Sequence, residues 1–512
     1  MNPGGLNCTT QDTEDTESGG LLTAADLSGG VRREVPAKNL RIALLTPYTG
    51  HNLGDAAIQD AIIANLRLRL PTAQFSGITL NSDNFLERHG TGAFPLCGPG
   101  RPFYGMCRGR VTDQPGDAWS LGPPSREERA SVSSVLRRAL KKIPFLWLCL
   151  RGIRSLGRRV SAELGHFSQG YRFLRTQDVL IVSGGGQLDE EWGGPWGHPY
   201  TLFKWAVLAR LARVPCAIVS VGACKINSRI SRIFLSAALR LAGYRSYRDK
   251  NSHEMAKRLL RRAAKDSVVP DLAFSLPSSE LAPPAGTRSI SRGRLVVAIS
   301  PIAYLRPGTW VSENPVLYDR YLQEMGRLVS QLLHRDYFLI VVWSGLGDDD
   351  RVFAEILERL DDESRQRSFQ QMHVPRIKAW KDVVELLQNI DFLVASRLHS
   401  TILGFVTKTP TIAISFDRKV DWVMEDLGQT DYLLHFRDFR AEDVVDALER
   451  IKYRRDAVVK RIALYLDSIV SVSKLQYDTL AALTLEGQRH RNERERPGIL
   501  SFWRKPVDTK CA

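Results

Sequence analysis

The sequence lacks the patterns that mark disulfide-rich, zinc-binding and membrane-spanning proteins. Its seven cysteines are widely spaced and include no C-x-x-C pair, so neither a disulfide framework nor a zinc site is indicated. The first residues show no basic-then-apolar signal pattern. No apolar run reaches the roughly 18 to 20 residues that a membrane span needs. We therefore expect a cytoplasmic protein in a reducing compartment.

Acidic residues are too few to balance the basic ones. Lys and Arg number 71 against 56 Asp and Glu, a formal net charge of +15 with a pI near 9.6. The excess favours an anionic partner such as a membrane surface, a nucleic acid or an anionic substrate, although a solvated basic face explains it equally well. Residues 126–160 hold ten Lys or Arg and two Glu, more than half of the excess.

Composition and periodicity divide the chain into two halves of the same kind. Short apolar runs typical of buried strands alternate with helical patterns, which implies parallel β-α-β units in each half. A stretch rich in Pro, Ser and Gly between the halves predicts a linker. The expected segments are a disordered tail (1–38), an N-terminal α/β domain (39–275) with a basic insertion at about 86–170, a linker (276–293), a C-terminal α/β domain (294–485) and a basic tail (486–512).

The residues that directly follow strands are the candidates for chemistry. In doubly wound domains, ligands collect at the carboxyl ends of the strands, and two such domains bind ligand in the cleft between them. A long loop is expected at 86–125. Strands are expected at 40–45, 178–183, 215–221, 244–248, 267–270, 295–300, 337–343, 391–395 and 411–415, and helices at 56–70, 199–213, 228–242, 251–264, 315–334, 349–360, 380–388 and 400–406.

Two glycine-rich segments follow predicted strands in the first half. In Gly50-His-Asn-Leu-Gly-Asp55, Asp55 can cap the next helix and the backbone amides can hold an anion, although a well-made turn explains the same residues. In Val182-Ser-Gly-Gly-Gly-Gln-Leu-Asp-Glu-Glu-Trp192, the glycines let a ligand approach the backbone. There a carboxylate of Asp189, Glu190 or Glu191 can take a proton from a sugar hydroxyl, and Trp192 and Trp196 can stack on a pyranose ring. The alternative is a glycine turn with incidental surface acids.

Cations follow three further strands. Arginine's planar fork suits a phosphate or carboxylate, so Arg248 is a candidate ligand, although a salt bridge to Asp249 is equally consistent. Arg397 and His399 are two residues apart, beside the positive end of a helix that begins near residue 400. They predict an anion pocket with a proton donor; the simpler interpretation is a helix cap. Lys419 adds a charge to the same pocket or is a solvated lysine.

Taken together, these motifs resemble the polysaccharide pyruvyl transferase family. Ser396-Arg-Leu-His399, followed by a strand that ends near a lysine, resembles its C-terminal signature. The glycine–aspartate start, the triple-glycine block and the Arg-Asp-x-x-Ser block occur in the family's order. Pro270-Asp-Leu-Ala-Phe274 resembles the strand end that precedes its interdomain linker. The similarity covers roughly residues 40–80 and 175–430.

The resemblance implies a fold and a reaction. The fold is α/β, with two doubly wound Rossmann-like domains facing each other across a cleft, similar to the two-domain nucleotide-sugar glycosyltransferases. The reaction moves the pyruvyl group of phosphoenolpyruvate onto sugar hydroxyls of a polysaccharide or lipid-linked oligosaccharide, as a ketal. No metal and no cofactor besides this donor substrate is implied.

The resemblance also implies residue roles. Arg248 and Arg397 grip the donor, His399 is the acid/base, and Asp189 lies beside the acceptor, with Glu190 as the neighbour that could replace it. The candidates are, as catalytic residues, His399, Asp189 and Arg397; as donor-binding residues, Arg248, Arg397, Lys419, Asn52, Gly54, Asp55 and Ser400; and as acceptor-binding residues, Glu190, Trp192 and His198.

The insertion at about 86–170 departs from the family's pattern, so it leaves the acceptor sugar open. Its apolar centre, 143–150, is flanked by arginines and is too short to span a bilayer. We hypothesise that residues 137–160 dock the enzyme on the anionic inner leaflet of the cytoplasmic membrane. An ordinary helix packed on the first domain is the alternative.

Three other functions compete with pyruvyl transfer. A nucleotide-sugar-dependent glycosyltransferase would use the same cationic pocket for a diphosphate. A non-catalytic relative would bind a glycan without turnover. Nucleic-acid binding is not expected, because the basic residues cluster without interleaved aromatic stacking platforms.

Overall fold

The computed structural model describes residues 39–98, 144–261, 266–277, 281, 291, 293–308 and 313–495, with side chains from residue 157 onward in the helix that begins at 144. The first half forms β1 (Arg41–Leu45), α1 (Leu53–Arg69), β2 (Gln74–Thr79), α2 (Ser82–His89), β3 (Ala93–Pro95), α4 (Pro144–Arg175), β4 (Val179–Ser183), the 3-10 helix η2 (Gly194–Trp196), α5 (His198–Leu211), β5 (Cys216–Val221), α6 (Arg229–Leu241), β6 (Tyr244–Tyr247), α7 (Lys250–Leu260), β7 (Ser267–Val268) and η3 (Leu272–Ser275).

The second half repeats the alternation of strands and helices. It forms β8 (Val296–Ser300), α8 (Pro315–His334), β9 (Phe338–Val341), α9 (Asp349–Leu357), α10 (Asp362–Gln371), β10 (Met372–His373), α11 (Trp380–Leu387), β11 (Phe392–Ala395), α12 (Leu398–Val406), β12 (Thr411–Ser415), α13 (Arg418–Asp426), η6 (Thr430–Tyr432), β13 (Leu433–His435), α14 (Ala441–Tyr453) and α15 (Arg455–Glu495).

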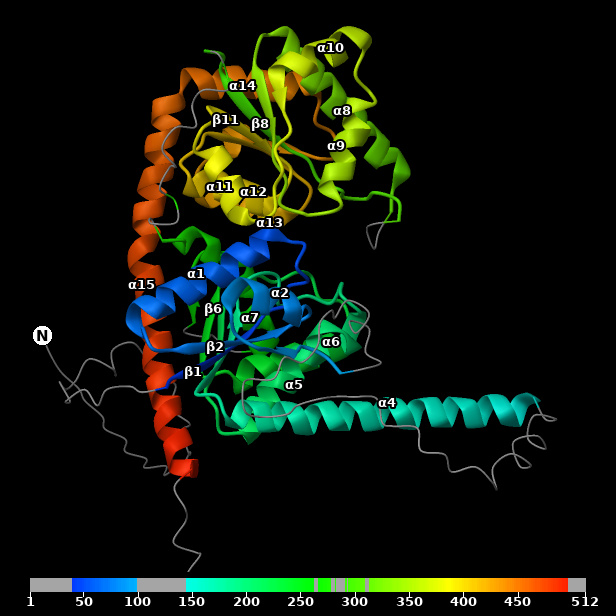
Figure 1. Cartoon of the computed structure of the whole chain (residues 1–512), viewed down its shortest axis with the longest axis vertical. Coiled ribbons are helices and arrows are strands. Elements are labelled where there is room, and N and C mark those ends of the chain that lie inside the picture. The colour runs from blue at the N-terminus through cyan, green and yellow to red at the C-terminus, as the bar shows by residue number, and fades with distance from the viewer. Residues whose placement is uncertain are drawn as a thin grey trace, which may run out of the picture. The chain divides into compact units, whose positions relative to one another are not determined.

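These elements make two doubly wound α/β domains, as predicted (Figure 1). In the described part of the chain, a seven-stranded sheet has the order β3-β2-β1-β4-β5-β6-β7, and a six-stranded sheet has the order β10-β9-β8-β11-β12-β13. The paired strands of both sheets run parallel. Strand order therefore reverses between β1 and β4 in the first sheet, and between β8 and β11 in the second.

The strand sequences explain why both sheets are covered on both faces. Val-Leu-Ile-Val-Ser in β4 and Val-Val-Ala-Ile-Ser in β8 are buried along their whole length. Continuous apolar runs of this kind are typical of parallel strands between two helical layers. The predicted strands 178–183, 295–300, 391–395 and 411–415 are confirmed to within one residue at each end.

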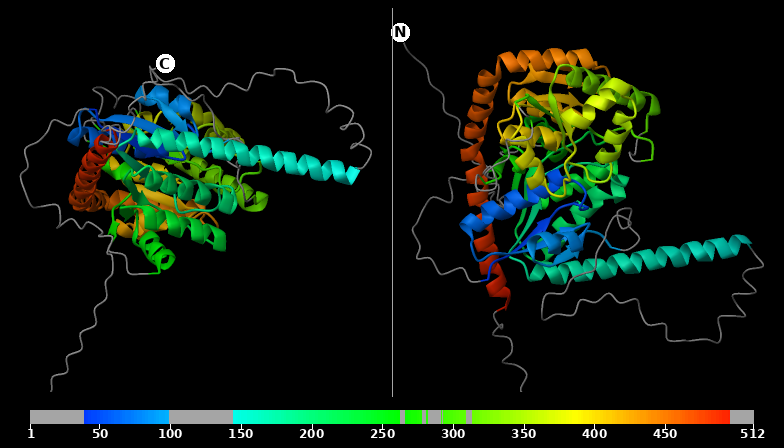
Figure 2. Two further views of the ribbon diagram at one scale, coloured as in Figure 1. Left: turned by 90° about the horizontal axis from the view of Figure 1, so that it is seen from below. Right: turned by 45° about the horizontal axis from the view of Figure 1, so that its top comes forward.

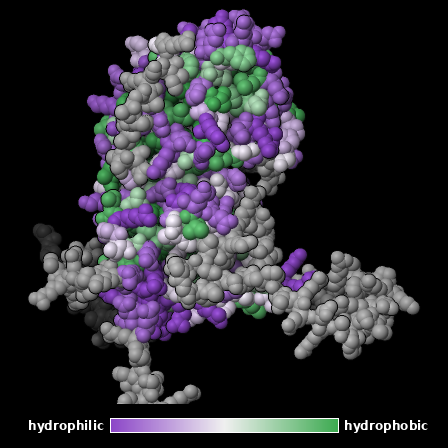
Figure 3. All heavy atoms as spheres, viewed as in Figure 1, coloured by the Kyte–Doolittle hydropathy of each residue, from purple (hydrophilic) through white to green (hydrophobic). Residues whose placement is uncertain are grey.

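In contrast to these buried strands, helix α10 is strongly polar, and the surface over it is hydrophilic (Figure 3).

The loop predicted from residue 86 is wrong at its start, because α2 continues to His89 and β3 occupies 93–95. A three-residue strand is too short to show an alternating pattern. Residues 99–143 of the predicted loop lie outside the described part of the chain.

Helix α4 belongs to the basic insertion. Its final turns pack against α5, whereas residues 157–161 are exposed (Figure 2). Most of the segment hypothesised to bind a membrane, 137–160, lies outside the described side chains. Among the described helices, none combines the length and apolar character that crossing a bilayer requires.

The last helix, α15, joins the two domains along one side (Figure 1). It follows α14 in the second domain, and its later turns pack on the first sheet. There Arg491 Nε pairs with Asp178 Oδ1 at 2.8 Å, and Gln476 Nε2 donates to Ser220 Oγ at 3.1 Å. Residues 486–495 of the predicted basic tail therefore belong to this helix.

Candidate active site

The loop after β1, at the point of strand-order reversal in the first sheet, meets the loop after β9 in the second sheet. Asn52, after β1, and Gly345, after β9, form an antiparallel bridge. Leu53 N donates to Ser344 O at 2.8 Å, and Leu346 N donates to His51 O at 2.8 Å. Because ligands of doubly wound sheets bind at such reversal points, this junction is the place to look for a site.

The turn after β1 is held by Asn52. Its Oδ1 accepts from Gly54 N at 3.0 Å, and its Nδ2 donates to Asp55 Oδ2 at 2.9 Å. The helix cap predicted at Asp55 is therefore wrong, since Asn52 caps α1 and Asp55 lies in its first turn. Burial raises the pKa of Asp55, and the nearby His399 opposes that rise.

His399 from the second domain packs directly on this turn. A Cβ atom on Gly54 would lie 1.9 Å from His399 Cγ, so only glycine lets the imidazole approach. On its other side, His399 Nε2 lies 3.9 Å from Asp271 Oδ2. The ring is thus placed between the start of α1 and a buried carboxylate.

Asp271 connects His399 with Arg248. Its side chain is 0% exposed, and Oδ2 lies 3.5 Å from Arg248 Nη1, while Oδ1 accepts from Ala273 N at 3.0 Å. Among the described residues, Asp271 Oδ2, Arg248 Nη2 and His399 Nε2 are buried and have no hydrogen-bond partner. Buried polar atoms are normally hydrogen-bonded, so the cluster around Asp271 retains bonding capacity that the described residues do not use.

Arg248 reaches that region because of a second glycine. The residue directly follows β6, and a Cβ atom on Gly222 would lie 2.5 Å from Arg248 Nη2. Its Nε lies 3.6 Å from Asp249 Oδ2, and the side chain is almost fully buried. The surface salt bridge considered for Arg248 and Asp249 is thus a buried contact, and it engages only one edge of the guanidinium.

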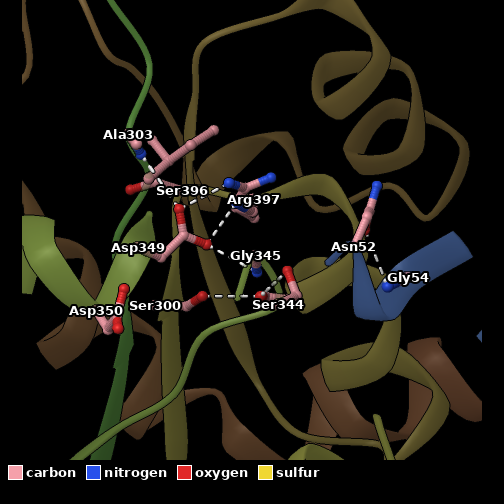
Figure 4. Close-up of polar contacts among 12 residues, drawn as sticks. Asn52, Gly54, Ser300, Ala303, Ser344, Gly345, Asp349, Asp350, Ser396 and Arg397 are labelled. Atoms are coloured by element: carbon pink, nitrogen blue, oxygen red, sulfur yellow. Dashed lines mark hydrogen bonds and ion pairs between the residues drawn. The ribbon is translucent and has the colours of Figure 1, made fainter. Parts of the chain in front are cut away.

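Arg397 is fixed by a carboxylate that the sequence analysis did not select (Figure 4). Its Nη2 donates to Asp349 Oδ1 at 2.7 Å, and its Nε lies 2.6 Å from Asp349 Oδ2. Asp349 also accepts from Gly345 N at 2.9 Å and Ala303 N at 3.3 Å. Burial raises the pKa of Asp349, and Arg397 opposes this. The two-point contact leaves Arg397 Nη1 as the nitrogen available to a ligand.

Ser400 serves the fold through its hydroxyl. Ser300 Oγ donates to Ser400 Oγ at 2.7 Å, and Ser400 Oγ donates to Ser344 Oγ at 3.1 Å. This buried chain ties the ends of β8 and β9 to α12. The first-turn amides of α12 receive no side-chain cap from Arg397, so the predicted donor contact of Ser400 is open only to its backbone N–H.

Asp189 and Lys419 meet at a thiol. Asp189 accepts from Glu191 N at 2.7 Å, and the side chains of Asp189 and Lys419 both lie beside the thiol of Cys224. Burial raises the pKa of Cys224 to about 12, so the thiol stays protonated. Lys419 Nζ also lies 3.6 Å from Asp417 Oδ2. A carboxylate of the first domain and an ammonium of the second are thus brought to one place.

The structure does not add the remaining acceptor candidates to this pair. Glu190 anchors the loop before α6, accepting from Asn227 N at 2.6 Å and Ser228 N at 3.2 Å. Trp192 is about half exposed on the loop before η2. His198 is 2% exposed, its Nε2 lies 2.9 Å from Gln187 Oε1, and burial lowers its pKa to about 4. Of the three, only Trp192 presents its side chain to a large ligand.

Three residues of the site were missed or given no role in the sequence analysis. Asp271 was quoted only within a motif, and Asp349 and Cys224 were not selected. Each lies just after a strand or at the start of the helix that follows one. Arg248 was selected because it directly follows a strand. The same criterion, applied to the residues after β5, β7 and β9, would have found these three.

Comparison with known proteins identifies a family and similar folds. The sequence model for polysaccharide pyruvyl transferase matches residues 52–418. No curated protein matches the chain. The family model includes Asn52, Gly54, Asp55, Asp189, Arg248, Asp271, Asp349, Arg397 and His399, and ends one residue before Lys419.

Similar solved structures include a UDP-GlcNAc 2-epimerase and a heptosyltransferase. One is the UDP-GlcNAc 2-epimerase from Neisseria meningitidis bound to UDP-GlcNAc, with 11% identity, a TM-score of 0.46, and coverage of 86% of this chain and 99% of that one. Another is the ADP-heptose LPS heptosyltransferase II of E. coli, with 13% identity, a TM-score of 0.39, and coverage of 81% and 100%. At this distance neither bears on what this chain binds.

Proposed function

The chain belongs to the polysaccharide pyruvyl transferase family, and we propose that it transfers the pyruvyl group of phosphoenolpyruvate to two hydroxyls of a sugar, forming a ketal. The acceptor is a polysaccharide or a lipid-linked oligosaccharide. The observation that carries this proposal is the meeting of Arg248 and His399 at the Asp271 carboxylate, with Arg397 two residues before His399 in the chain.

Donor binding is assigned to the cationic part of the junction. Phosphoenolpyruvate carries a phosphate and a carboxylate, and charge-assisted hydrogen bonds to such groups contribute about 1.5 to 3 kcal/mol each. Arg248 Nη2, which is buried without a partner among the described residues, and Arg397 Nη1 supply donors. The first-turn amides of α12 add the positive end of a helix.

His399 is assigned the proton transfer. In ketal formation the methylene carbon of the donor gains a proton and becomes a methyl group, two C–O bonds form at the central carbon, and the bond to the phosphate oxygen breaks. Of the two hydroxyl protons, one replaces the proton given to the methylene carbon, and the other leaves with the phosphate, which departs as hydrogen phosphate. A positioned imidazole that gives and takes protons accelerates such steps by about 10² to 10⁴.

Asp271 is assigned a positioning role. Its Oδ2 faces both His399 Nε2 and Arg248 Nη1, so it stabilises a protonated imidazole and orients it at the same time.

Asp189 and Lys419 are assigned to the acceptor. A carboxylate near a sugar hydroxyl can take its proton as the hydroxyl attacks the donor. Lys419 lies near Asp189 across the domain junction, with Cys224 beside both. Trp192, three residues after Asp189, offers an exposed ring for stacking on the sugar.

The proposal is tested by acceptor-dependent phosphate release. Purified full-length protein is incubated with phosphoenolpyruvate and a panel of glycans and lipid-linked oligosaccharides, and then with nucleotide sugars in place of phosphoenolpyruvate. We expect phosphate release that needs both phosphoenolpyruvate and an acceptor, and that is lost in His399→Ala. Turnover of a nucleotide sugar with no response to phosphoenolpyruvate would contradict the proposal in favour of a glycosyltransferase.

A further inference from the structure

Helices α4, α5 and α6 cover one face of the first sheet, and α1 covers the other (Figure 2). The outer surface of this helical layer carries large apolar side chains in contact with solvent. Ile233 is 66% exposed and Trp196 is 50% exposed. The exposed apolar residues of the layer and of the loop that leads into it are Val160, Leu164, Trp192, Trp196, Ile230 and Ile233.

Ring contacts show that these residues share one surface. The ring of Trp196 lies 5.4 Å from that of Phe234 on α6 and 5.8 Å from that of Tyr200 on α5. Tyr200 Oη in turn donates to Glu163 on α4 at 3.0 Å. Phe234 is next to Ile233, and Glu163 is next to Leu164. The apolar side chains therefore extend from α6 across η2 and α5 to α4.

The same surface is rich in positive charge. From Trp192 to Leu241 the chain holds 50 residues with seven Lys or Arg and not one Asp or Glu. On the described part of α4, Glu163 is the one acidic residue, and it pairs with the buried Lys204 at 3.0 Å. Exposed cations of α4, of α6 and of the loop before α6 include Arg158, Arg159, Lys225, Arg229 and Arg232, and Glu190 accepts from Asn227 N beside the start of α6.

Helix α6 shows how the charge and the apolar side chains are combined. Its inner face buries Leu235, Ala238 and Leu239 against the sheet. Its outer face presents Ile230 and Ile233 one turn apart, each beside an exposed arginine. Apolar side chains at helical spacing, flanked by arginines and accompanied by tryptophans, are typical of surfaces that lie in the interfacial region of a bilayer.

We propose that this face, defined by Leu164, Trp196, Ile230 and Ile233 with Arg229 and Arg232, docks the protein on an anionic phospholipid bilayer. A second copy of the chain fits less well, because a two-fold contact centred on α6 would set arginines against arginines. A nucleic acid would use the cations but would leave the isoleucines in water. An anionic bilayer buries the isoleucines in its interface and pairs the arginines with its headgroups.

The docked orientation would serve the acceptor side of the site. Trp192 lies on the loop that leads into the docking face, and Asp189, three residues earlier, lies at the junction with Lys419. A glycan attached to a membrane lipid would then leave the bilayer close to Asp189. This consequence rests on the proposed function, whereas the docking itself does not.

The experiment is vesicle flotation with full-length protein, which needs no activity. The vesicles are phosphatidylcholine with or without phosphatidylglycerol, at low and high salt. The test variant is Ile230→Asp/Ile233→Asp, and the matched control is Val470→Asp/Leu475→Asp on α15, where the exposed fractions are similar. Arg229→Glu/Arg232→Glu is a second test variant that leaves both isoleucines in place.

Wild type and the α15 control should float with anionic vesicles and much less with neutral ones or at high salt. Each test variant should lose at least about tenfold in partitioning. Flotation of both test variants at the wild-type level would overturn the proposal and would leave the segment around 143–150 as the membrane contact. So would a self-association in solution that the test variants abolish while wild type fails to float.

Discussion

The proposed chemistry depends on Asp271, a residue to which the sequence alone gave no role. A carboxylate with no exposed surface, facing an arginine and a histidine at 3.5 and 3.9 Å, is costly to bury unless its charge is used. The distances are too long for strong hydrogen bonds in either pair. Asp271 is therefore placed to act on His399 electrostatically when a proton is exchanged.

We expect Asp271→Asn to lower kcat about 100-fold without raising KM for phosphoenolpyruvate. The amide keeps the shape and can still accept from Ala273 N, but it removes the charge that stabilises a protonated His399. Asp249→Asn is the matched control, because Asp249 contacts Arg248 at 3.6 Å and caps α7. Equal losses in both variants, or a loss confined to KM, would mean that Asp271 only holds the arginine.

His198 should make stability depend on pH. Burial lowers its pKa from 6.5 to about 4, so between these values the unfolded chain binds a proton that the folded chain excludes. The stability that the neutral His198 contributes to the folded state is fully present above pH 6.5. It is lost as pH falls toward 4, which lowers the free energy of unfolding by about 3 kcal/mol. The free energy of unfolding, measured with urea at several pH values between 4 and 7, should change less with pH for His198→Gln than for wild type. An unchanged pH dependence would contradict the assignment.

At the scale of single elements, the start of α1 is shaped by its contact with the other domain. Gly54 lies in the first turn of the helix, where alanine would otherwise be favoured by about 1 kcal/mol. The approach of His399 to the backbone explains why glycine is required there.

We expect Gly54→Ala to reduce activity at least 100-fold by displacing His399. Gly165→Ala is the matched control, because Gly165 lies within α4 and an added Cβ atom there meets nothing within 4 Å. The control should keep full activity and a thermal midpoint at or above that of wild type. Normal activity of Gly54→Ala in a steady-state assay would show that the packing of His399 on α1 is dispensable.

The elements that sequence predicted well are those whose burial is apolar. Strands such as β4 and β8 are continuous hydrophobic runs, so their positions follow from composition alone. Helix α15 was missed because several of the residues it buries are polar. Gln476, Thr484 and Arg491 are buried in its later turns, and they show no apolar stripe at helical spacing.

The site was predictable only in part, because it too contains buried polar residues that local sequence does not mark as buried. Arg248, Arg397 and His399 follow strands, and the resemblance to a known family marked them. Asp349 stands in an acidic run, Asp348 to Asp350, that is typical of an exposed helix start. Its burial and its contact with Arg397 arise from tertiary packing, which local sequence does not encode.

At the scale of the whole molecule, the relation between the two sheets is fixed at several points. The junction loops exchange backbone hydrogen bonds, Trp380 Nε1 donates to Asp60 Oδ2 at 2.6 Å, and α15 packs on both domains. The site contains residues from both sheets, so its geometry depends on these contacts.

We expect Arg491→Met to destabilise the protein by about 3 kcal/mol. The variant leaves the buried Asp178 carboxylate without its partner on α15. Hydrogen exchange should rise first in the last turns of α15, and thermal unfolding should shift downward. Arg489→Met, on the exposed side of the same helix, should change neither. Equal protection in the two variants would contradict the assigned role of the ion pair.

The most direct test of the account is the structure of the product formed in deuterated water. The protein is given phosphoenolpyruvate and an acceptor glycan in D₂O, and the glycan is examined by NMR and mass spectrometry. The account predicts a pyruvate ketal whose methyl group carries one solvent deuterium, formed by wild type and not by His399→Ala. A glycan that gains a sugar instead, or a ketal that His399→Ala forms at the wild-type rate, would contradict it.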